Sequence, residues 1–300
     1  MKLTNEFGKL LKTLECHKDF VYSLTNLRNG YLASSSADKT IKVWSVNDGV
    51  LIKTLEGHES AVQAVVNIDN GNLASASDDG TVKLWDWSKG KCLKSLADHD
   101  YNVQSLAFKE KGFLASGSWD DKIKIWDVSA GRCIRTLDGG DDEDCVSSLA
   151  FVDLNVLASG SRMHNTVKMW DTRDGKLMRT LAGHTSSVNA LVGLENGLLA
   201  SASLDKSVKV WNVGDGKLVR SFGEHSGGVH SMVLISRGRL ASGGGFSDKQ
   251  IKIWTPSEGG LVKTVDNVHK DAVLSLAFVD GGCLASGSKD KTINLWNVNE

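Results

Sequence analysis

Residues 32–44 read LASSSADKTIKVW, and this stretch decides the fold because close copies of it recur along the chain. The copies of equal length are LASASDDGTVKLW (73–85), LASGSWDDKIKIW (114–126), LASASLDKSVKVW (199–211) and LASGSKDKTINLW (284–296). Two longer copies are LASGSRMHNTVKMW, which ends at Trp170 with one extra residue, and LASGGGFSDKQIKIW, which ends at Trp254 with two. Self-similarity of this kind indicates a repeat architecture.

The tryptophan that ends each copy sets the length of the repeat. The intervals between successive members are 41, 41, 44, 41, 43 and 42 residues for Trp44, Trp85, Trp126, Trp170, Trp211, Trp254 and Trp296. This period matches one four-stranded blade of a β-propeller. We therefore expect an all-β fold of seven blades, each with four antiparallel strands.

The interior of a repeat also reads as four short strands. In the first repeat they are expected at residues 20–25, 31–36, 40–45 and 50–55, with no helical periodicity of useful length between them. Asn29-Gly30 separates the first two strands, and this pair tolerates the positive φ angles of a tight hairpin. The sequence therefore predicts strand-turn-strand units throughout.

The outermost strand of the last repeat is displaced to the start of the chain. Fourth-strand segments such as LIKTL (51–55) and LVKTV (261–265) resemble LLKTL at residues 10–14, whereas the chain ends three strands into its last repeat. We expect residues 8–14 to supply the outer strand of the seventh blade and close one propeller domain over residues 1–300, which removes an open sheet edge. Lys and Arg recur on these outer strands, where we interpret them as charges that discourage edge pairing.

Composition names no partner. The chain has 35 Lys and Arg against 36 Asp and Glu, a formal net charge of −1, so nucleic acid and membrane are not expected partners. Its N-terminus lacks the apolar segment of a secretory signal, and its five cysteines show no zinc-site spacing. We expect a monomeric propeller with reduced thiols, in the cytoplasm or the nucleus, without metal or cofactor.

The repeat resembles the WD40 family. His58, preceded by Gly57, stands 27 residues before Trp85-Asp86, and Trp-Asp recurs at residues 126–127 and 170–171. The resemblance covers the whole chain and implies a seven-bladed WD40 β-propeller that acts as a non-catalytic platform for protein or peptide partners.

Serine, histidine and aspartate recur together with the tryptophan, which raises the question of a hydrolase. Six copies of such a set are more than an enzyme needs, and no oxyanion hole or pocket is evident, so we expect no catalytic residue. In the family this tetrad is structural: a chain from indole to hydroxyl to imidazole to carboxylate satisfies every buried polar group. The sets are His17, Ser34, Asp38 and Trp44; His58, Ser75, Asp79 and Trp85; His99, Ser116, Asp120 and Trp126; His184, Ser201, Asp205 and Trp211; His225, Ser242, Asp248 and Trp254; and His269, Ser286, Asp290 and Trp296.

The fourth repeat departs from this pattern. It carries the acidic run at residues 139–144 where the others have histidine, and His164 where they have aspartate, so only Ser159 and Trp170 of its tetrad remain. We predict that it forms the least rigid blade. Two interpretations stay open: a blade released for function, or sequence drift.

By resemblance, partners dock on the top face around the central channel. Three positions per blade point there: the two that flank the first-strand valine and the one before the tetrad aspartate. The expected partner-binding residues are Phe20, Tyr22, Asp78, Trp119, Asp141, Asp142, Glu143, Met163, Leu204, His230, Leu274 and Lys289. Our hypothesis is that the acidic loop and Asp78 pair with a Lys or Arg segment that also makes cation–π contact with Trp119 or Tyr22.

Several other functions compete with this hypothesis. A platform could be a ubiquitin-ligase substrate receptor, a histone-tail reader or an assembly scaffold. An enzyme around the channel would need convergent acids or metal ligands, and only His164 and His230 lie outside the tetrads. A nucleic-acid-binding propeller is disfavoured by the acidic loop and the neutral charge balance.

Overall fold

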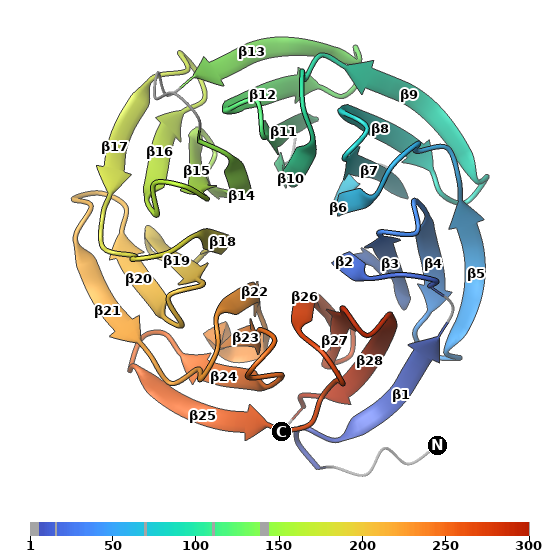
Figure 1. The fold of residues 1–300 in the computed structure, drawn as a ribbon, viewed down its shortest axis with the longest axis vertical. Helices are drawn as coiled ribbons and strands as arrows, with labels where there is room; N and C mark the ends of the chain where they lie inside the picture. Colours follow the sequence, from blue (N-terminus) through green and yellow to red (C-terminus); the bar gives the residue numbers. More distant parts are fainter. Residues whose placement is uncertain (1–5, 16, 69–70, 110–111, 139–143, 300) are drawn as a thin grey trace.

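The computed structural model describes residues 6–15, 17–68, 71–109, 112–138 and 144–299. Within this part of the chain, antiparallel strands form seven four-stranded sheets, arranged as blades around a common axis (Figure 1). The predicted all-β, seven-bladed propeller is therefore confirmed. Blade 1 holds β2 to β5, and the following blades take four strands each up to blade 6. Blade 7 holds β26, β27, β28 and, at its outer edge, β1.

The strands are short and follow one another with tight connections. In chain order they are β1 (Leu10–Glu15), β2 (Val21–Arg28), β3 (Tyr31–Ser36), β4 (Ile41–Ser45), β5 (Val50–Leu55), β6 (Val62–Ile68), β7 (Asn72–Ser77), β8 (Thr81–Asp86), β9 (Lys91–Ala97), β10 (Val103–Lys109), β11 (Phe113–Ser118), β12 (Lys122–Asp127), β13 (Arg132–Asp138), β14 (Val146–Asp153), β15 (Val156–Ser161), β16 (Val167–Asp171), β17 (Leu177–Leu181), β18 (Val188–Gly193), β19 (Leu198–Ser203), β20 (Val208–Asn212), β21 (Leu218–Phe222), β22 (Val229–Leu234), β23 (Leu240–Gly244), β24 (Ile251–Thr255), β25 (Gly260–Val265), β26 (Val273–Val279), β27 (Cys283–Ser288) and β28 (Thr292–Asn297). A 3-10 turn, η2, spans Ser236–Gly238. No helix in the described residues is long and apolar enough to cross a membrane.

The first repeat shows how local sequence sets these boundaries. β2 runs to Arg28, three residues beyond the expected end, because Arg28 still pairs with Tyr31 across a two-residue loop. The loop residues Asn29 and Gly30 have φ angles of 52° and 79°. Both lie in the left-handed region that a twisted two-residue hairpin requires, which explains the Asn-Gly pair.

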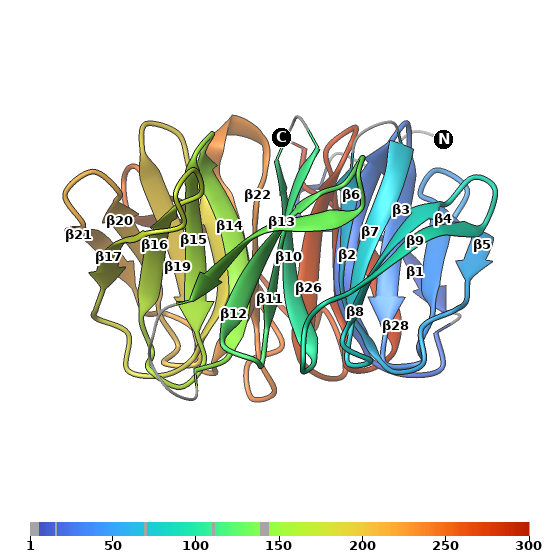
Figure 2. The ribbon, with the colours of Figure 1, turned by 90° about the horizontal axis from the view of Figure 1, so that it is seen from above.

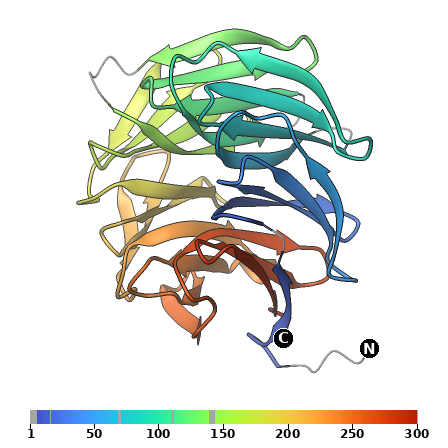
Figure 3. The ribbon, with the colours of Figure 1, turned by 45° about the vertical axis from the view of Figure 1, so that its right-hand side comes forward.

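The ring closes as the displaced segment predicts. β1 pairs antiparallel with β28, with Lys12 opposite Leu295 and Leu14 opposite Ile293. In Figure 3, β1 lies along the outer edge of the sheet that ends the chain. Leu14 is 2% exposed and packs in a core with Val21 and Trp44 of blade 1 and with Leu295 of blade 7. The first and last parts of the chain thus share one hydrophobic core.

Hydrophobic cores lie between neighbouring blades. One core combines Ile41 and Leu55 of blade 1 with Val62 and Trp85 of blade 2. The repeat tryptophans are nearly inaccessible, and Trp85 is 1% exposed. Each tryptophan therefore joins its own blade to the preceding one, and truncation of a side chain of this kind to alanine costs about 3–5 kcal/mol.

The basic residues of the outer strands do more than keep edges soluble. Lys94 Nζ donates a hydrogen bond of 2.5 Å to the carbonyl of Ser129, in the next blade. Arg179 Nη1 reaches the carbonyl of Gly214 at 2.9 Å in the same way. Lys12 donates to the carbonyl of Asn47, which links blade 7 to blade 1. The interpretation as edge charges alone is therefore incomplete, because these cations also tie adjacent blades together.

Seen edge-on, the blades stand side by side and the loops gather on two opposite faces (Figure 2). We define the top face as the one that carries the loops into each first strand and the loops between each second and third strand. The hairpin at Asn29 and the turns between third and fourth strands lie on the opposite face, because the strands alternate in direction.

Candidate functional site

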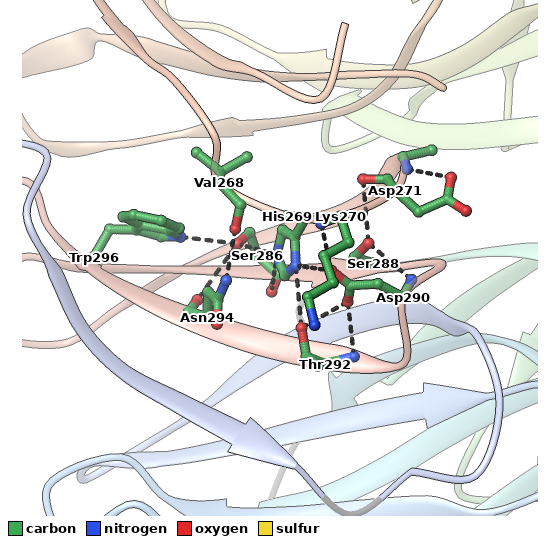
Figure 4. Close-up of polar contacts among 11 residues, drawn as sticks. Val268, His269, Lys270, Asp271, Ser286, Ser288, Asp290, Thr292, Asn294 and Trp296 are labelled. Atoms are coloured by element: carbon green, nitrogen blue, oxygen red, sulfur yellow. Dashed lines mark hydrogen bonds and ion pairs between the residues drawn. The ribbon is translucent and has the colours of Figure 1, made fainter. Parts of the chain in front are cut away.

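The tetrad of blade 7 is a continuous chain of hydrogen bonds (Figure 4). Trp296 Nε1 donates to Ser286 Oγ at 2.8 Å, and His269 Nε2 lies 2.8 Å from the same oxygen. His269 Nδ1 lies 3.0 Å from Asp290 Oδ2. With the Nδ1 proton directed to the carboxylate, Nε2 accepts from the serine, so every donor has an acceptor.

The same arrangement recurs in blades 1, 2, 3, 5 and 6. In blade 5, Trp211 donates to Ser201 Oγ at 2.8 Å, and His184 lies 2.7 Å from both Ser201 Oγ and Asp205 Oδ2. Burial lowers the pKa of His184 against the opposing effect of Asp205. Burial alone would raise the pKa of Asp205, but hydrogen bonds from Ser207 and His184 lower it to about 2. The pair therefore joins a neutral imidazole to a carboxylate at neutral pH.

These groups are placed for structure rather than for nucleophilic attack. The six tetrad serines are 0% exposed, so a substrate carbonyl cannot reach them. The aspartates also hold the top-face turns: Asp38 Oδ2 accepts the Lys18 N–H at 2.9 Å, and its Oδ1 accepts the Thr40 N–H at 3.0 Å. Each tetrad thus anchors a turn to a buried tryptophan.

Blade 4 keeps only part of this network. Trp170 donates to Ser159 Oγ at 2.8 Å, and Asp144 accepts a 2.7 Å hydrogen bond from Ser161. His164 stands where the other blades have aspartate, 3.3 Å from Asp144, and its side chain is 45% exposed. Among the described residues the buried Thr166 hydroxyl has no hydrogen-bond partner, whereas its counterpart Thr40 bonds Asp38. The blade 4 threonine hydroxyl thus lacks the partner that the tetrad aspartate supplies in blade 1.

The acidic run of blade 4 is not a uniformly exposed loop. Asp141, Asp142 and Glu143 lie outside the described residues. Asp144 is 7% exposed and bonds Ser161, so it belongs to the interior of the blade. Asp144 therefore does not extend the predicted partner-binding residues 141–143, because its carboxylate bonds inside the blade.

A cavity of about 620 Å³ lies around the axis at the top face, and we refer to its lining as the channel mouth. Six of the expected partner-binding residues line it: Tyr22, Asp78, Trp119, Leu204, His230 and Leu274. They come from six different blades, which confines the cavity to the centre of the ring. Phe20, Met163 and Lys289 are not part of this lining.

Arg162, not Met163, occupies the docking position of blade 4. In other blades this residue donates its N–H to the loop before the first strand, as Trp119 does to the Asn102 carbonyl at 3.0 Å. Arg162 makes the equivalent bond to Cys145 at 3.0 Å and lines the channel mouth. Met163 is the inserted residue and is 62% exposed. The prediction of Met163 came from counting back from the tryptophan, which assumes that the extra residue precedes the docking position. In the structure the extra residue follows that position.

Phe20 and Lys289 contact each other beside the channel mouth. The Lys289 ammonium lies 4.9 Å from the centroid of the Phe20 ring and 5.8 Å from that of Phe246. Phe20 also packs edge-on against Tyr22, with ring centroids 6.3 Å apart. Phe246, on the insertion of blade 6, is 67% exposed and was not among the expected site residues.

Trp119 already has an intramolecular cation. The Arg162 guanidinium carbon lies 5.2 Å from the Trp119 ring centroid, on the lining of the channel mouth. A Lys or Arg of a partner would have to displace Arg162 to use the same contact. The contact between a partner cation and Trp119 or Tyr22 stays a prediction, and at Trp119 the partner would compete with Arg162.

At the channel mouth, hydrogen bonds hold the Asp78 carboxylate in a fixed orientation. Its two oxygens accept hydrogen bonds of 2.9 Å from Gln63 of its own blade and Gln104 of the next. Burial raises its pKa above the ordinary value of 3.8, and the two amides oppose that shift. Burial and the nearby Asp78 raise the pKa of Tyr22. Both glutamines follow a first-strand valine and so occupy predicted top-face positions, but their hydrogen bonds to Asp78, 15 and 26 residues away, were not predicted.

His230 contributes a neutral imidazole on another wall of the channel mouth. Burial, with a smaller effect of Lys289, lowers its pKa. Asn189 Nδ2 lies 3.5 Å from its Nδ1. Among the described residues, no group of three or more His, Cys, Asp or Glu side chains could hold a metal ion.

Comparison with protein families extends the sequence resemblance to every blade. A search of curated proteins finds no significant match. The family model described as "WD domain, G-beta repeat" matches residues 8–45, 49–86, 90–127, 131–171, 175–212, 216–255 and 259–297. Together with the closed seven-bladed ring, these seven matches show that the chain belongs to the WD40 family.

Proposed function

We propose that this propeller is a non-catalytic interaction platform whose channel mouth receives a Lys- or Arg-containing segment of a protein partner, with Asp78 as the anchoring carboxylate. WD40 propellers generally serve protein–protein interaction and are generally non-catalytic. The observation that carries the proposal is the geometry of Asp78, a partly buried acid fixed by two amides beside an open cavity.

The immobilised carboxylate supports a cationic ligand for a physical reason. Gln63 and Gln104 set its orientation before a ligand arrives, which reduces the entropy lost on binding. Partial burial strengthens a charge-assisted hydrogen bond relative to bulk water. Tyr22 lies on the same lining and offers an aromatic wall beside the acid.

Arg162 limits where the ligand charge can lie. The Arg162 guanidinium lines the channel mouth and repels a second cation near blade 4. A basic side chain of the partner is therefore favoured toward blades 1 to 3, on the side of Asp78. The proposed partner segment therefore carries one basic residue at the Asp78 side. In this proposal the basic residue lies beside Asp78, and not against Trp119 as the hypothesis from the sequence allowed.

A peptide titration tests this proposal. Acetylated and amidated peptides of Gly and Ala with one central Arg, Lys, Glu or Leu are titrated against the protein by calorimetry. We expect the Arg and Lys peptides to bind and the Glu peptide not to bind. Asp78→Asn keeps the shape and removes the charge, and one glutamine must turn its amide oxygen toward the new NH2 group to keep its bond. It should weaken binding at least about tenfold, equivalent to about 1.4 kcal/mol.

The matched control is Asp215→Asn, the same substitution in a turn on the opposite face. The Asp215 side chain is 48% exposed and lies 3.7 Å from Lys217. This variant should bind like the parent protein. Equal affinity of the Asp78→Asn variant and the parent for the Arg peptide would disprove the role of Asp78.

A further inference from the structure

A second pocket opens on the top face away from the channel, between blades 3 and 4. Its volume is about 380 Å³, and its walls come from the loops around Tyr101 and Trp119 of blade 3 and from Cys145 of blade 4. Trp119 lines both this pocket and the channel mouth, whereas Arg162 lines only the channel mouth. We call this site the blade 3–4 pocket.

Two exposed aromatic side chains form its apolar wall. Tyr101 is 63% exposed and Trp119 is 41% exposed, which is unusual for residues of this size. Their backbones are fixed: the Tyr101 carbonyl accepts the Ser118 hydroxyl at 3.2 Å, and the Trp119 N–H donates to Asn102 at 3.0 Å. Both rings are therefore exposed to solvent while hydrogen bonds hold their backbones in place.

The remaining walls favour positive charge. Asp100, Asp120 and Asp121 line the pocket together with one cation, Lys122, which gives three negative charges against one positive. Burial and the nearby Asp121 raise the pKa of the Cys145 thiol, with Arg162 opposing them, so this wall is neutral at neutral pH. An anion would meet a net repulsive field here.

The hydrogen-bond acceptors of the pocket determine whether it favours a cation with N–H donors or one without them. Asp120 Oδ2 already accepts from His99 at 2.7 Å and from the Asp100 N–H at 3.1 Å. Its Oδ1 accepts the Lys122 N–H at 3.1 Å. The Asp120 carboxylate, whose side chain is 3% exposed, thus supplies negative potential but has few lone pairs left for a ligand. A cation that needs no hydrogen bonds gains most from aromatic rings and such a field.

From this combination we infer that the blade 3–4 pocket binds an alkylated ammonium group, such as a methylated lysine side chain, between Tyr101 and Trp119. The pocket is separate from the Asp78 site proposed above and does not depend on it. A partner could fill both, with Trp119 as the wall between them.

Tetramethylammonium chloride is the probe for this inference. The protein, labelled with ¹⁵N at the indoles of its nine tryptophans, is titrated with this salt while sodium chloride is removed to hold ionic strength constant. Trp119→Phe identifies the Trp119 indole signal by its loss. We expect a saturable shift of that signal with a dissociation constant of about 1–10 mM, and a much smaller shift with ammonium chloride.

Variants separate this pocket from its surroundings. Tyr101→Ala should abolish saturation, whereas Phe246→Ala, which removes another exposed aromatic ring of the top face, should leave it unchanged. Asp78→Asn should also leave it unchanged, although the same variant should bind the Arg peptide at least about tenfold more weakly. The inference is overturned if the Trp119 signal does not saturate, if Tyr101→Ala responds like the parent, or if Asp78→Asn removes the response.

Discussion

Removal of one tetrad hydroxyl measures how much the buried network stabilises a blade. Ser201→Ala in blade 5 deletes an oxygen that accepts from Trp211 at 2.8 Å and bonds His184 at 2.7 Å. Trp211 is 2% exposed and the His184 side chain 1%, so water cannot replace either bond without a rearrangement. Each buried polar group left without a partner costs about 1–3 kcal/mol, so the expected loss is about 2–6 kcal/mol.

Blade 4 supplies the matched comparison. Ser159→Ala is the same substitution at the same strand position, but within the described residues Ser159 Oγ bonds only Trp170, at 2.8 Å. One orphaned group predicts a loss of about 1–3 kcal/mol. The difference between the two variants therefore reports the histidine arm of the tetrad, about 1–3 kcal/mol.

Equilibrium unfolding in urea, followed by tryptophan fluorescence, gives both free energies. For a chain of 300 residues, the Ser201→Ala loss should lower Tm by roughly 3–9 °C. Circular dichroism checks that both variants keep the parent strand signal. If the two variants are destabilised equally, within about 0.5 kcal/mol, the imidazole does not depend on the serine and the network argument fails.

Three other outcomes follow from the same structure. Asp205 has a folded-state pKa of about 2 against an ordinary 3.8, so its contribution to stability is present above 3.8 and lost as pH falls toward 2. The lowered pKa of His184 makes the unfolded state take up a proton first below 6.5, so urea midpoints should fall from that pH downward; a flat profile from pH 7 to 3 would contradict both. Leu14→Ala should lower the free energy of unfolding by about 2–5 kcal/mol because Leu14 packs between blades 7 and 1, and a loss below about 1 kcal/mol would argue against ring closure through β1. Amide hydrogen exchange should be faster in β15 and β16 of blade 4 than in β19 and β20 of blade 5, and equal protection would remove the prediction that blade 4 is the least rigid.

Much of the fold could be predicted because its rules are periodic. The spacing from Trp44 to Trp296 fixes seven blades, and the match of LLKTL to the other fourth strands fixes the closure that pairs Leu14 with Ile293. Repeated spacing shows that Trp44, Ser34, His17 and Asp38 belong to a recurring set, and the family resemblance implies the chain of bonds that the structure contains. Because such a pattern occurs many times, an irregular residue in one copy does not hide it in the others.

The site was harder to predict because it consists of exceptions to the repeat. The insertion in blade 4 could fall before or after the docking position, and only the bond from Arg162 to Cys145 decides it. From the sequence, the Asp144 side chain could face solvent or the blade interior. It lies in the interior, where it accepts a hydrogen bond in a blade that lacks the tetrad histidine and aspartate. Contacts between blades, such as Asp78 to Gln104 or Arg162 to Trp119, join residues with no sequence relation. Such pairs depend on how adjacent blades pack.

One comparison tests most directly whether the tetrads serve stability and the channel mouth serves binding. The affinity for the Arg-containing peptide is measured for the Ser201→Ala and Asp78→Asn variants at a temperature where both are folded. We predict that Ser201→Ala binds like the parent despite its lower stability, and that Asp78→Asn loses at least about tenfold in affinity while its stability changes little. The opposite result, in which Ser201→Ala abolishes binding and Asp78→Asn preserves it, would place the function in the buried hydroxyls and contradict the account.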